Sequence, residues 1–197
     1  MYMFKKQVFV SFMAAFVLLL GACSNTNDAD KESKKDNTQN EETDHSNMDH
    51  SNMDHSSSGE VPKGLKEAEN PTYKVGSKAV METDHMSGMK GAEAIIVGAY
   101  ETTVYAISYD QTTDGKRVKN HKWVIHEELK DAGEAPLKPG DEVVVNADHM
   151  KGMDGAKATI DSAEETTVYM VDFIPTTGGE EVKNHKWVTE EELLPVK

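Results

Sequence analysis

The chain has 197 residues, a formal net charge of −14 and a single cysteine, Cys23. The negative charge argues against nucleic acid and anionic membrane surfaces as partners, because both are negatively charged themselves. With one cysteine, the chain can form no intrachain disulfide, and its folded part cannot hold a metal ion through thiolates.

Residues 1–22 predict a lipoprotein signal peptide. Two lysines are followed by an apolar run that is too short for a comfortable membrane span. The run ends in Leu20-Gly21-Ala22-Cys23, which matches the bacterial lipobox, where the cysteine is lipidated and becomes the mature N-terminus. We therefore expect a lipid anchor on Cys23 that holds the protein on the extracellular face of the cell membrane. An ordinary signal peptide followed by an incidental cysteine is the alternative.

Residues 23–60 predict a disordered, lipid-anchored spacer, because this stretch is polar and has almost no apolar side chains to bury. Within it, residues 44–55 repeat a five-residue unit that carries histidine and methionine. His-rich tracts bind metal ions, and here there is no core that the methionines could fill. Low-complexity drift in a linker is the alternative. The candidate metal ligands of this tract are His45, Met48, His50, Met53 and His55.

The rest of the chain is an internal repeat. A shift of 64 positions aligns His85 with His149 and Trp123 with Trp187 without a gap, which predicts two repeat domains, 70–135 and 136–197. Each contains short runs of β-branched and aromatic residues separated by Gly- and Pro-containing turns, and neither shows helical periodicity. The expected fold is all-β, with two tandem small SH3-like or KOW-like β-barrels after the disordered His/Met-rich tail.

Each repeat contains one loop, at 84–92 and 148–156, with the pattern Asp-His-Met-x-Gly-Met-x-Gly-Ala. Thioether and imidazole are the ligands that select Cu(I), and imidazole also accepts Cu(II). The alternative is that the methionines are flexible apolar fillers at the end of a barrel and that each histidine makes an ordinary hydrogen bond. The candidate ligands of the two loops are His85, Met86, Met89, His149, Met150 and Met153.

A second motif, Val-Lys-Asn-His-Lys-Trp-Val, occurs at 118–124 and 182–188. Strand alternation predicts that its histidine and tryptophan share one face, with the tryptophan in the core. His121 and His185 either complete a metal site or fix the strand through a hydrogen bond, and the sequence leaves both roles open. The chain has no nucleophile–base constellation, phosphate loop or HExxH motif, so we expect no enzyme.

Taken together, the lipobox, the His/Met-rich tail and the two repeated motifs resemble the YdhK-like lipoproteins of Gram-positive bacteria, a family that includes the copper-tolerance lipoprotein CopL. The resemblance implies a surface protein that binds and sequesters copper, as Cu(I) or Cu(II), for copper tolerance. It makes a copper exporter a candidate partner, and it supplies no ligand set. The alternative function is a cell-wall or protein-binding module with SH3-like repeats and no metal role.

Overall fold

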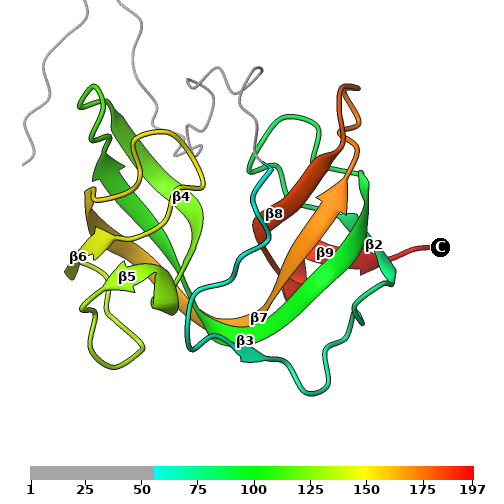
Figure 1. The fold of residues 1–197 in the computed structure, drawn as a ribbon, viewed down its shortest axis with the longest axis horizontal. Helices are drawn as coiled ribbons and strands as arrows, with labels where there is room; N and C mark the ends of the chain where they lie inside the picture. The colour runs from blue at the N-terminus through cyan, green and yellow to red at the C-terminus, as the bar shows by residue number, and fades with distance from the viewer. Residues whose placement is uncertain (1–55) are drawn as a thin grey trace, which may run out of the picture. The chain divides into compact units, whose positions relative to one another are not determined.

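The computed structural model describes residues 56–197, which form nine β-strands and two short 3-10 turns (Figure 1). The predicted all-β class is confirmed. None of the described residues belongs to a helix long and apolar enough to cross a membrane. The predicted signal peptide, the lipidation site Cys23 and the tract at 44–55 lie outside the described residues.

Two long antiparallel strands organise the fold: β3 (Glu93–Asp110) in the first repeat and β7 (Lys157–Phe173), its counterpart in the second (Figure 1). They pair along nearly their whole length. At the midpoint Thr102 pairs with Thr166, which is its own counterpart 64 positions further on. Self-pairing of this kind is typical of the isologous two-fold interface between identical subunits. The two repeats of this chain therefore meet as the two halves of a symmetric dimer do.

The shorter strands flank this central pair and interleave the two repeats. Strand β3 pairs with β1 (Lys66–Glu67), β2 (Lys78–Met81) and β4 (Arg117–Ile125). Strand β7 pairs with β6 (Glu142–Val145) and β8 (Val182–Thr189). Two short strands complete the sheet: β5 (Leu129–Lys130) pairs with β6, and β9 (Leu193–Pro195) pairs with β2. The turns η1 (His126–Glu128) and η2 (Glu190–Glu192) follow β4 and β8. Consequently β2 of the first repeat adjoins β9 of the second, and β5 of the first adjoins β6 of the second.

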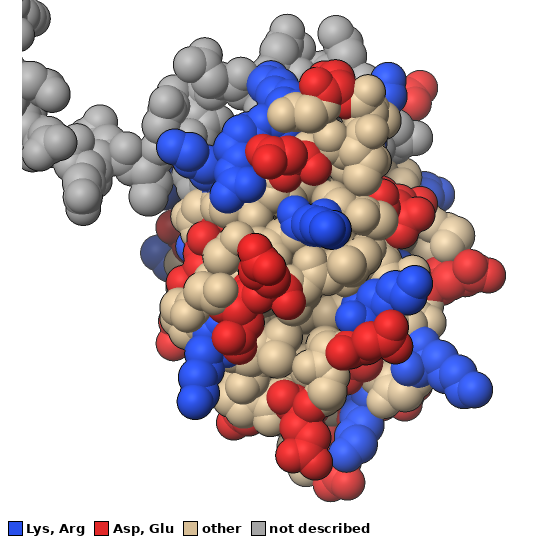
Figure 2. All heavy atoms as spheres, turned by 90° about the vertical axis from the view of Figure 1, so that its left-hand side faces the viewer, with Lys and Arg blue, Asp and Glu red and all other residues tan. Residues whose placement is uncertain are grey.

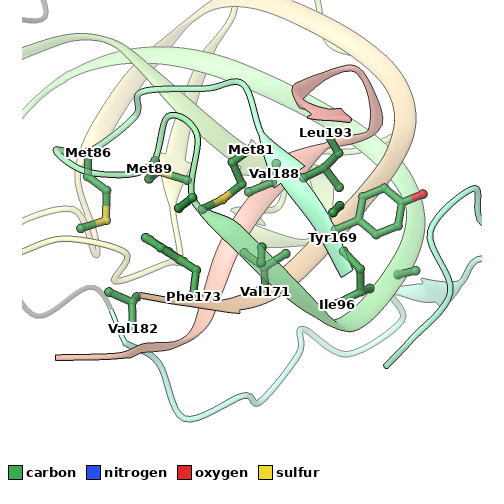
Figure 3. Close-up of a cluster of buried hydrophobic side chains, with 14 residues drawn as sticks. Met81, Met86, Met89, Ile96, Tyr169, Val171, Phe173, Val182, Val188 and Leu193 are labelled. Atoms are coloured by element: carbon green, nitrogen blue, oxygen red, sulfur yellow. The ribbon is translucent and has the colours of Figure 1, made fainter. Parts of the chain in front are cut away.

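The hydrophobic cores are exchanged between the repeats. One cluster joins the first half of repeat one to the second half of repeat two, with Met81 and Ile96 packed among side chains such as Val171 (Figure 3). Another joins the remaining halves and contains Tyr105 and Ile160. The predicted boundaries at 70–135 and 136–197 therefore describe units of sequence, whereas each of these two clusters takes residues from both units.

A third buried cluster consists largely of equivalent residues from the two copies, including Trp123 with Trp187 and Val104 with Val168. The register between β3 and β7 shifts at two places, on either side of the midpoint. Such bulges bend a strand and change which side chains face a given surface. One continuous strand can therefore supply residues to several clusters in succession.

The register of β4 shifts immediately before its tryptophan. Tyr105 pairs with Val124 and Ile107 pairs with His121, so that two steps along β3 correspond to three along β4. The strict alternation expected of this motif, with His121 and Trp123 on one face, is therefore wrong. The same shift occurs in β8.

Candidate functional site

The tip of each His-Met loop is docked on a turn of the other repeat. The backbone carbonyl of Gly88 accepts a hydrogen bond from the Thr176 N–H at 2.9 Å, and that of Gly152 accepts one from the Thr112 N–H at 2.9 Å. Both glycines have positive φ, and a Cβ on Gly88 would lie 2.7 Å from the Cβ of Pro175. Glycine is needed here for its backbone conformation and for the close approach.

The structure separates the predicted ligands of each loop into two groups. Met89 and Met153 are fully buried in the hydrophobic clusters and do not line a cavity with the loop histidines. These two methionines are therefore apolar fillers of the core, which was the alternative to metal binding that the sequence left open. Met86 and its counterpart Met150 belong to the same clusters but also line the central cavity described below; Met86 lies at one end of its cluster (Figure 3).

The loop histidines each meet a glutamate from the other repeat. His85 Nε2 is 2.7 Å from Glu192 Oε1, and His149 Nε2 is 2.8 Å from Glu128 Oε1. The two pairs are equivalent under the 64-residue shift, and all four side chains are at most 16% exposed. Sequence reasoning missed both glutamates, although each is a counterpart of the other and sits just after the Lys-Trp motif.

The second oxygen of each glutamate is bonded to a tryptophan. The Trp123 indole N–H donates to Glu192 Oε2 at 3.0 Å, and the Trp187 indole N–H donates to Glu128 Oε2 at 3.1 Å. The same oxygens accept the backbone N–H that precedes each 3-10 turn, for example that of Thr189 at 3.0 Å. Each carboxylate therefore links a histidine, a tryptophan and a turn, and its position is determined by all three.

These contacts keep both carboxylates ionised. Burial by itself raises the pKa of Glu192, but the hydrogen bond and charge of His85, together with the N–H donors of Thr189 and Trp123, outweigh it and lower the pKa to about 2. Burial also raises the pKa of Glu128, and the corresponding donors around it bring that pKa below its ordinary value. An ionised carboxylate accepts hydrogen bonds only, so each histidine presents a protonated Nε2 to it.

The other ring nitrogen of each loop histidine is an orphan. Nδ1 of His85 and Nδ1 of His149 are buried and have no hydrogen-bond partner among the described residues. In the neutral form of a ring whose Nε2 donates to a carboxylate, Nδ1 carries the lone pair. Each loop therefore offers one imidazole nitrogen in the form that binds a metal ion.

A cavity of about 1230 Å³, here called the central cavity, brings these groups together. The rings of His121 and His149 lie 6.3 Å apart between centroids. Within residues 56–197, no group of three or more His, Cys, Asp or Glu side chains is placed to hold a metal ion. A metal site here would therefore combine imidazole with thioether. The soft ligands that line the central cavity are His85, Met86, His121, His149, Met150 and His185.

The lining of the central cavity carries no excess of negative charge. Its charged side chains are Glu60, Lys63, Asp84, Lys116, Arg117, Lys119, Lys122, Glu127, Glu128, Asp148 and Lys186, so basic and acidic groups are nearly balanced. Figure 2 shows the same mixture on the face formed by β4, β5 and β6, where acidic and basic side chains are interspersed. A cation would be selected here by the chemistry of the ligands, not by a strong negative field.

The comparisons with known proteins agree with this architecture. A family model described as "Protein of unknown function (DUF1541)" matches residues 75–126 and 139–190, two segments related by the 64-residue shift. The predicted tandem repeat is therefore confirmed. The chain is 58% identical over 181 residues to the protein of Bacillus subtilis (strain 168) described as "Uncharacterized protein YdhK", covering 92% of this chain and 85% of that protein.

Solved structures of the same Bacillus subtilis protein are similar to the described fold. One is a crystal structure at 2.00 Å resolution, with 63% identity and a TM-score of 0.70, which covers 74% of this chain and 99% of that one. Another is a solution NMR structure of the YdhK C-terminal domain, with 64% identity and a TM-score of 0.59, which covers 61% of this chain and 92% of that one.

Proposed function

The chain belongs to the DUF1541 family, and from this starting point we propose that it is a lipid-anchored extracellular protein that binds and sequesters copper. The observation that carries the proposal is the central cavity, where the two repeats bring four imidazoles and two thioethers to one lining. The anchor would be Cys23, on the lipobox argument. Sequestration near the membrane would lower the free ion and so provide copper tolerance.

The donor set favours copper over other common ions. Calcium and magnesium prefer carboxylate and carbonyl oxygen, and Glu128, the buried carboxylate on the cavity lining, is already occupied by His149 and Trp187. Neutral thioether and imidazole donors match a soft monovalent ion such as Cu(I), and imidazole also suits Cu(II). The nearly balanced charge of the lining supports the same choice, because a monovalent ion bound by neutral donors needs little negative charge around it.

The His/Met-rich tract at 44–55 would act together with the central cavity. Ser57, which follows the tract closely in sequence, lines the cavity, donates its backbone N–H to the Lys183 carbonyl and donates its hydroxyl to the Asn184 carbonyl. The tract is therefore joined covalently to the chain at the cavity. Ligands tethered at short range act at a high effective concentration. We expect the tract to capture copper and the cavity to retain it more tightly.

A titration separates these contributions. The mature protein is titrated with Cu(I) against a competing chelator and compared with a variant that lacks 44–55 and with a variant carrying His85→Asn, Met86→Leu, His149→Asn and Met150→Leu. The deletion should remove weak sites, and the cavity variant should remove tight ones. The matched control, Met89→Leu with Met153→Leu, changes the buried methionines of the same loops and should keep both classes.

The same stoichiometry and affinity in all variants, or no copper binding by the wild type, would contradict the proposal. Retention on purified cell wall that does not depend on copper would favour the binding-module alternative. The anchor is tested separately, by labelling cells with a palmitate analogue. Wild-type protein should carry the label and stay with the membrane fraction, and the Cys23→Ser variant should do neither.

A further inference from the structure

We infer that Nδ1 of His85 and Nδ1 of His149 are the metal-binding atoms of two equivalent soft-metal sites, and that Glu192 and Glu128 are positioning residues that each repeat supplies to the site of the other. This inference deepens the copper-binding function proposed above and rests on it. The family comparison and the sequence motifs do not provide it, because neither points to the glutamates or to a particular ring nitrogen.

The first argument is the carboxylate behind each imidazole. A metal-ligating histidine almost always donates its other ring N–H to a carboxylate, a carbonyl or water, which fixes the tautomer and makes the ligating nitrogen more basic. His85 and His149 have this arrangement, with Nε2–carboxylate distances of 2.7 Å and 2.8 Å. The carboxylates are themselves held by an indole N–H and a backbone N–H. The rings are therefore oriented before any ion binds.

The second argument is the orphaned nitrogen opposite each carboxylate. A buried polar atom left without a partner costs about 1–3 kcal/mol, so such atoms are rare in folded proteins. Here the same atom is left over at two equivalent positions, Nδ1 of His85 and Nδ1 of His149. An ion bound at each site would satisfy the lone pair of its own histidine. A purely structural histidine–glutamate pair would explain the Nε2 contacts but not the repeated orphan.

The third argument is that other soft ligands line the same cavity. The rings of His121 and His149 lie 6.3 Å apart between centroids, and two imidazoles that share one ion through bonds near 2 Å have centroids separated by roughly this distance. Met150 lines the same cavity directly after His149. In the other copy the corresponding groups are His185 and Met86, and both also line the cavity.

Each site is therefore assembled from both repeats. At the second site, His149 belongs to repeat two, whereas Glu128 and His121 belong to repeat one. At the first site, His85 belongs to repeat one and Glu192 to repeat two. An isolated repeat would contain a loop histidine but not the carboxylate that orients it.

The test is histidine NMR of the mature protein with Ag(I), a diamagnetic ion with the ligand preferences of Cu(I). In the ion-free protein at alkaline pH, where the rings are neutral, the ¹⁵N shifts of His85 and His149 should show protonated Nε2 and unprotonated Nδ1. Adding Ag(I) should shift the Nδ1 resonances of both residues while Nε2 keeps its proton. Binding of Ag(I) that leaves both Nδ1 resonances unchanged would overturn the inference.

Variants test the positioning role. Glutamine in place of Glu128 and Glu192 can still accept from tryptophan, but its amide N–H can donate to histidine Nε2 and drive the proton to Nδ1. The double variant should therefore lose about 10- to 100-fold in Cu(I) affinity at the cavity sites. The control is Glu191→Gln, an exposed carboxylate in the same turn as Glu192, which should change nothing. Unchanged affinity in a double variant with the wild-type circular dichroism spectrum would also overturn the inference.

The outcomes distinguish this inference from the broader proposal. If only histidines of the tract at 44–55 respond to Ag(I), the protein still binds soft metal, and only the assignment of the Nδ1 sites is lost. If no histidine of the chain responds and Cu(I) is not bound, both the inference and the proposed function are contradicted. The ion-free and Ag(I)-loaded spectra of the wild type decide this even if a glutamate variant fails to fold.

Discussion

Acidification should remove the stabilisation that Glu192 contributes to the fold. The pKa of this buried carboxyl falls from an ordinary value of 4.5 to about 2 in the folded protein. A difference of about 2.5 between the two values corresponds to about 3 kcal/mol of unfolding free energy, since one pKa unit is about 1.4 kcal/mol. The side chain is 16% exposed, so solvent screens its contacts only weakly.

The direction follows from the lowered pKa. The folded state holds its proton less strongly than the unfolded state, so the stabilisation is fully present above pH 4.5 and is lost as the pH falls toward 2. The assay is urea unfolding of the ion-free protein, followed by fluorescence between pH 7 and pH 2.5, for the wild type and Glu192→Gln. Wild type should exceed the variant by up to about 3 kcal/mol at pH 7, and this excess should fall to about 1 kcal/mol or less at pH 2.5.

A matched surface pair provides the control. Glu93 forms an ion pair with Lys78, and both side chains are about half exposed. Its replacement by glutamine should change the unfolding free energy by less than about 1 kcal/mol at any pH, because exposed ion pairs contribute little. If the difference in unfolding free energy between wild type and Glu192→Gln stays constant from pH 7 to pH 2.5, Glu192 is not a buried carboxylate with a strongly lowered pKa.

Three further experiments with substituted proteins test the packing around the site. Trp123→Phe removes the indole donor to Glu192 and should lower the unfolding free energy by about 2 kcal/mol in urea, with the acid transition moved to higher pH. Met89→Ala should cost about 2–5 kcal/mol because it opens a cavity in the core, whereas Met89→Leu should cost less than about 1.5 kcal/mol and leave Cu(I) binding unchanged. Gly88→Ala and Gly91→Ala both place a side chain at positive φ, but only Gly88 has neighbours within 4 Å. Thermal denaturation should therefore show the Gly88 variant to be less stable, by at least about 1 kcal/mol.

The class of fold and the duplication could be predicted because both can be recognised directly from patterns in the sequence. Runs such as Thr166 to Phe173 are rich in β-branched and aromatic residues, and a gapless shift of 64 reveals the repeat directly. The exchange of halves could not be predicted in this way. A periodic pattern indicates which side chains are buried but not which partner covers them. The shift aligns the copies equally well whether each packs on itself or on the other.

The candidate site was only partly predictable for the same reason. Met86 and Met89 are three positions apart and chemically identical, yet one lines the central cavity and the other is fully buried. Glu128 and Glu192 lie in acidic stretches that read as solvated surface. Their burial depends on a histidine more than 20 positions away in the case of Glu128 and more than 100 in the case of Glu192. No local pattern encodes such a contact.

The exchange also joins metal binding to folding. Each proposed site takes its imidazole from one repeat and its carboxylate from the other, so an ion bound there holds the two repeats together. A ligand that binds only the folded state stabilises it by about 2.7 kcal/mol at 100 times its dissociation constant. Cu(I) should therefore raise the midpoint of thermal unfolding of the protein without residues 44–55 as much as that of the wild type. The Glu128→Gln, Glu192→Gln variant should show a much smaller rise, because its tract remains but its cavity sites are weakened. An increase that disappears with the tract and survives in the glutamate variant would place the stabilising copper outside the fold.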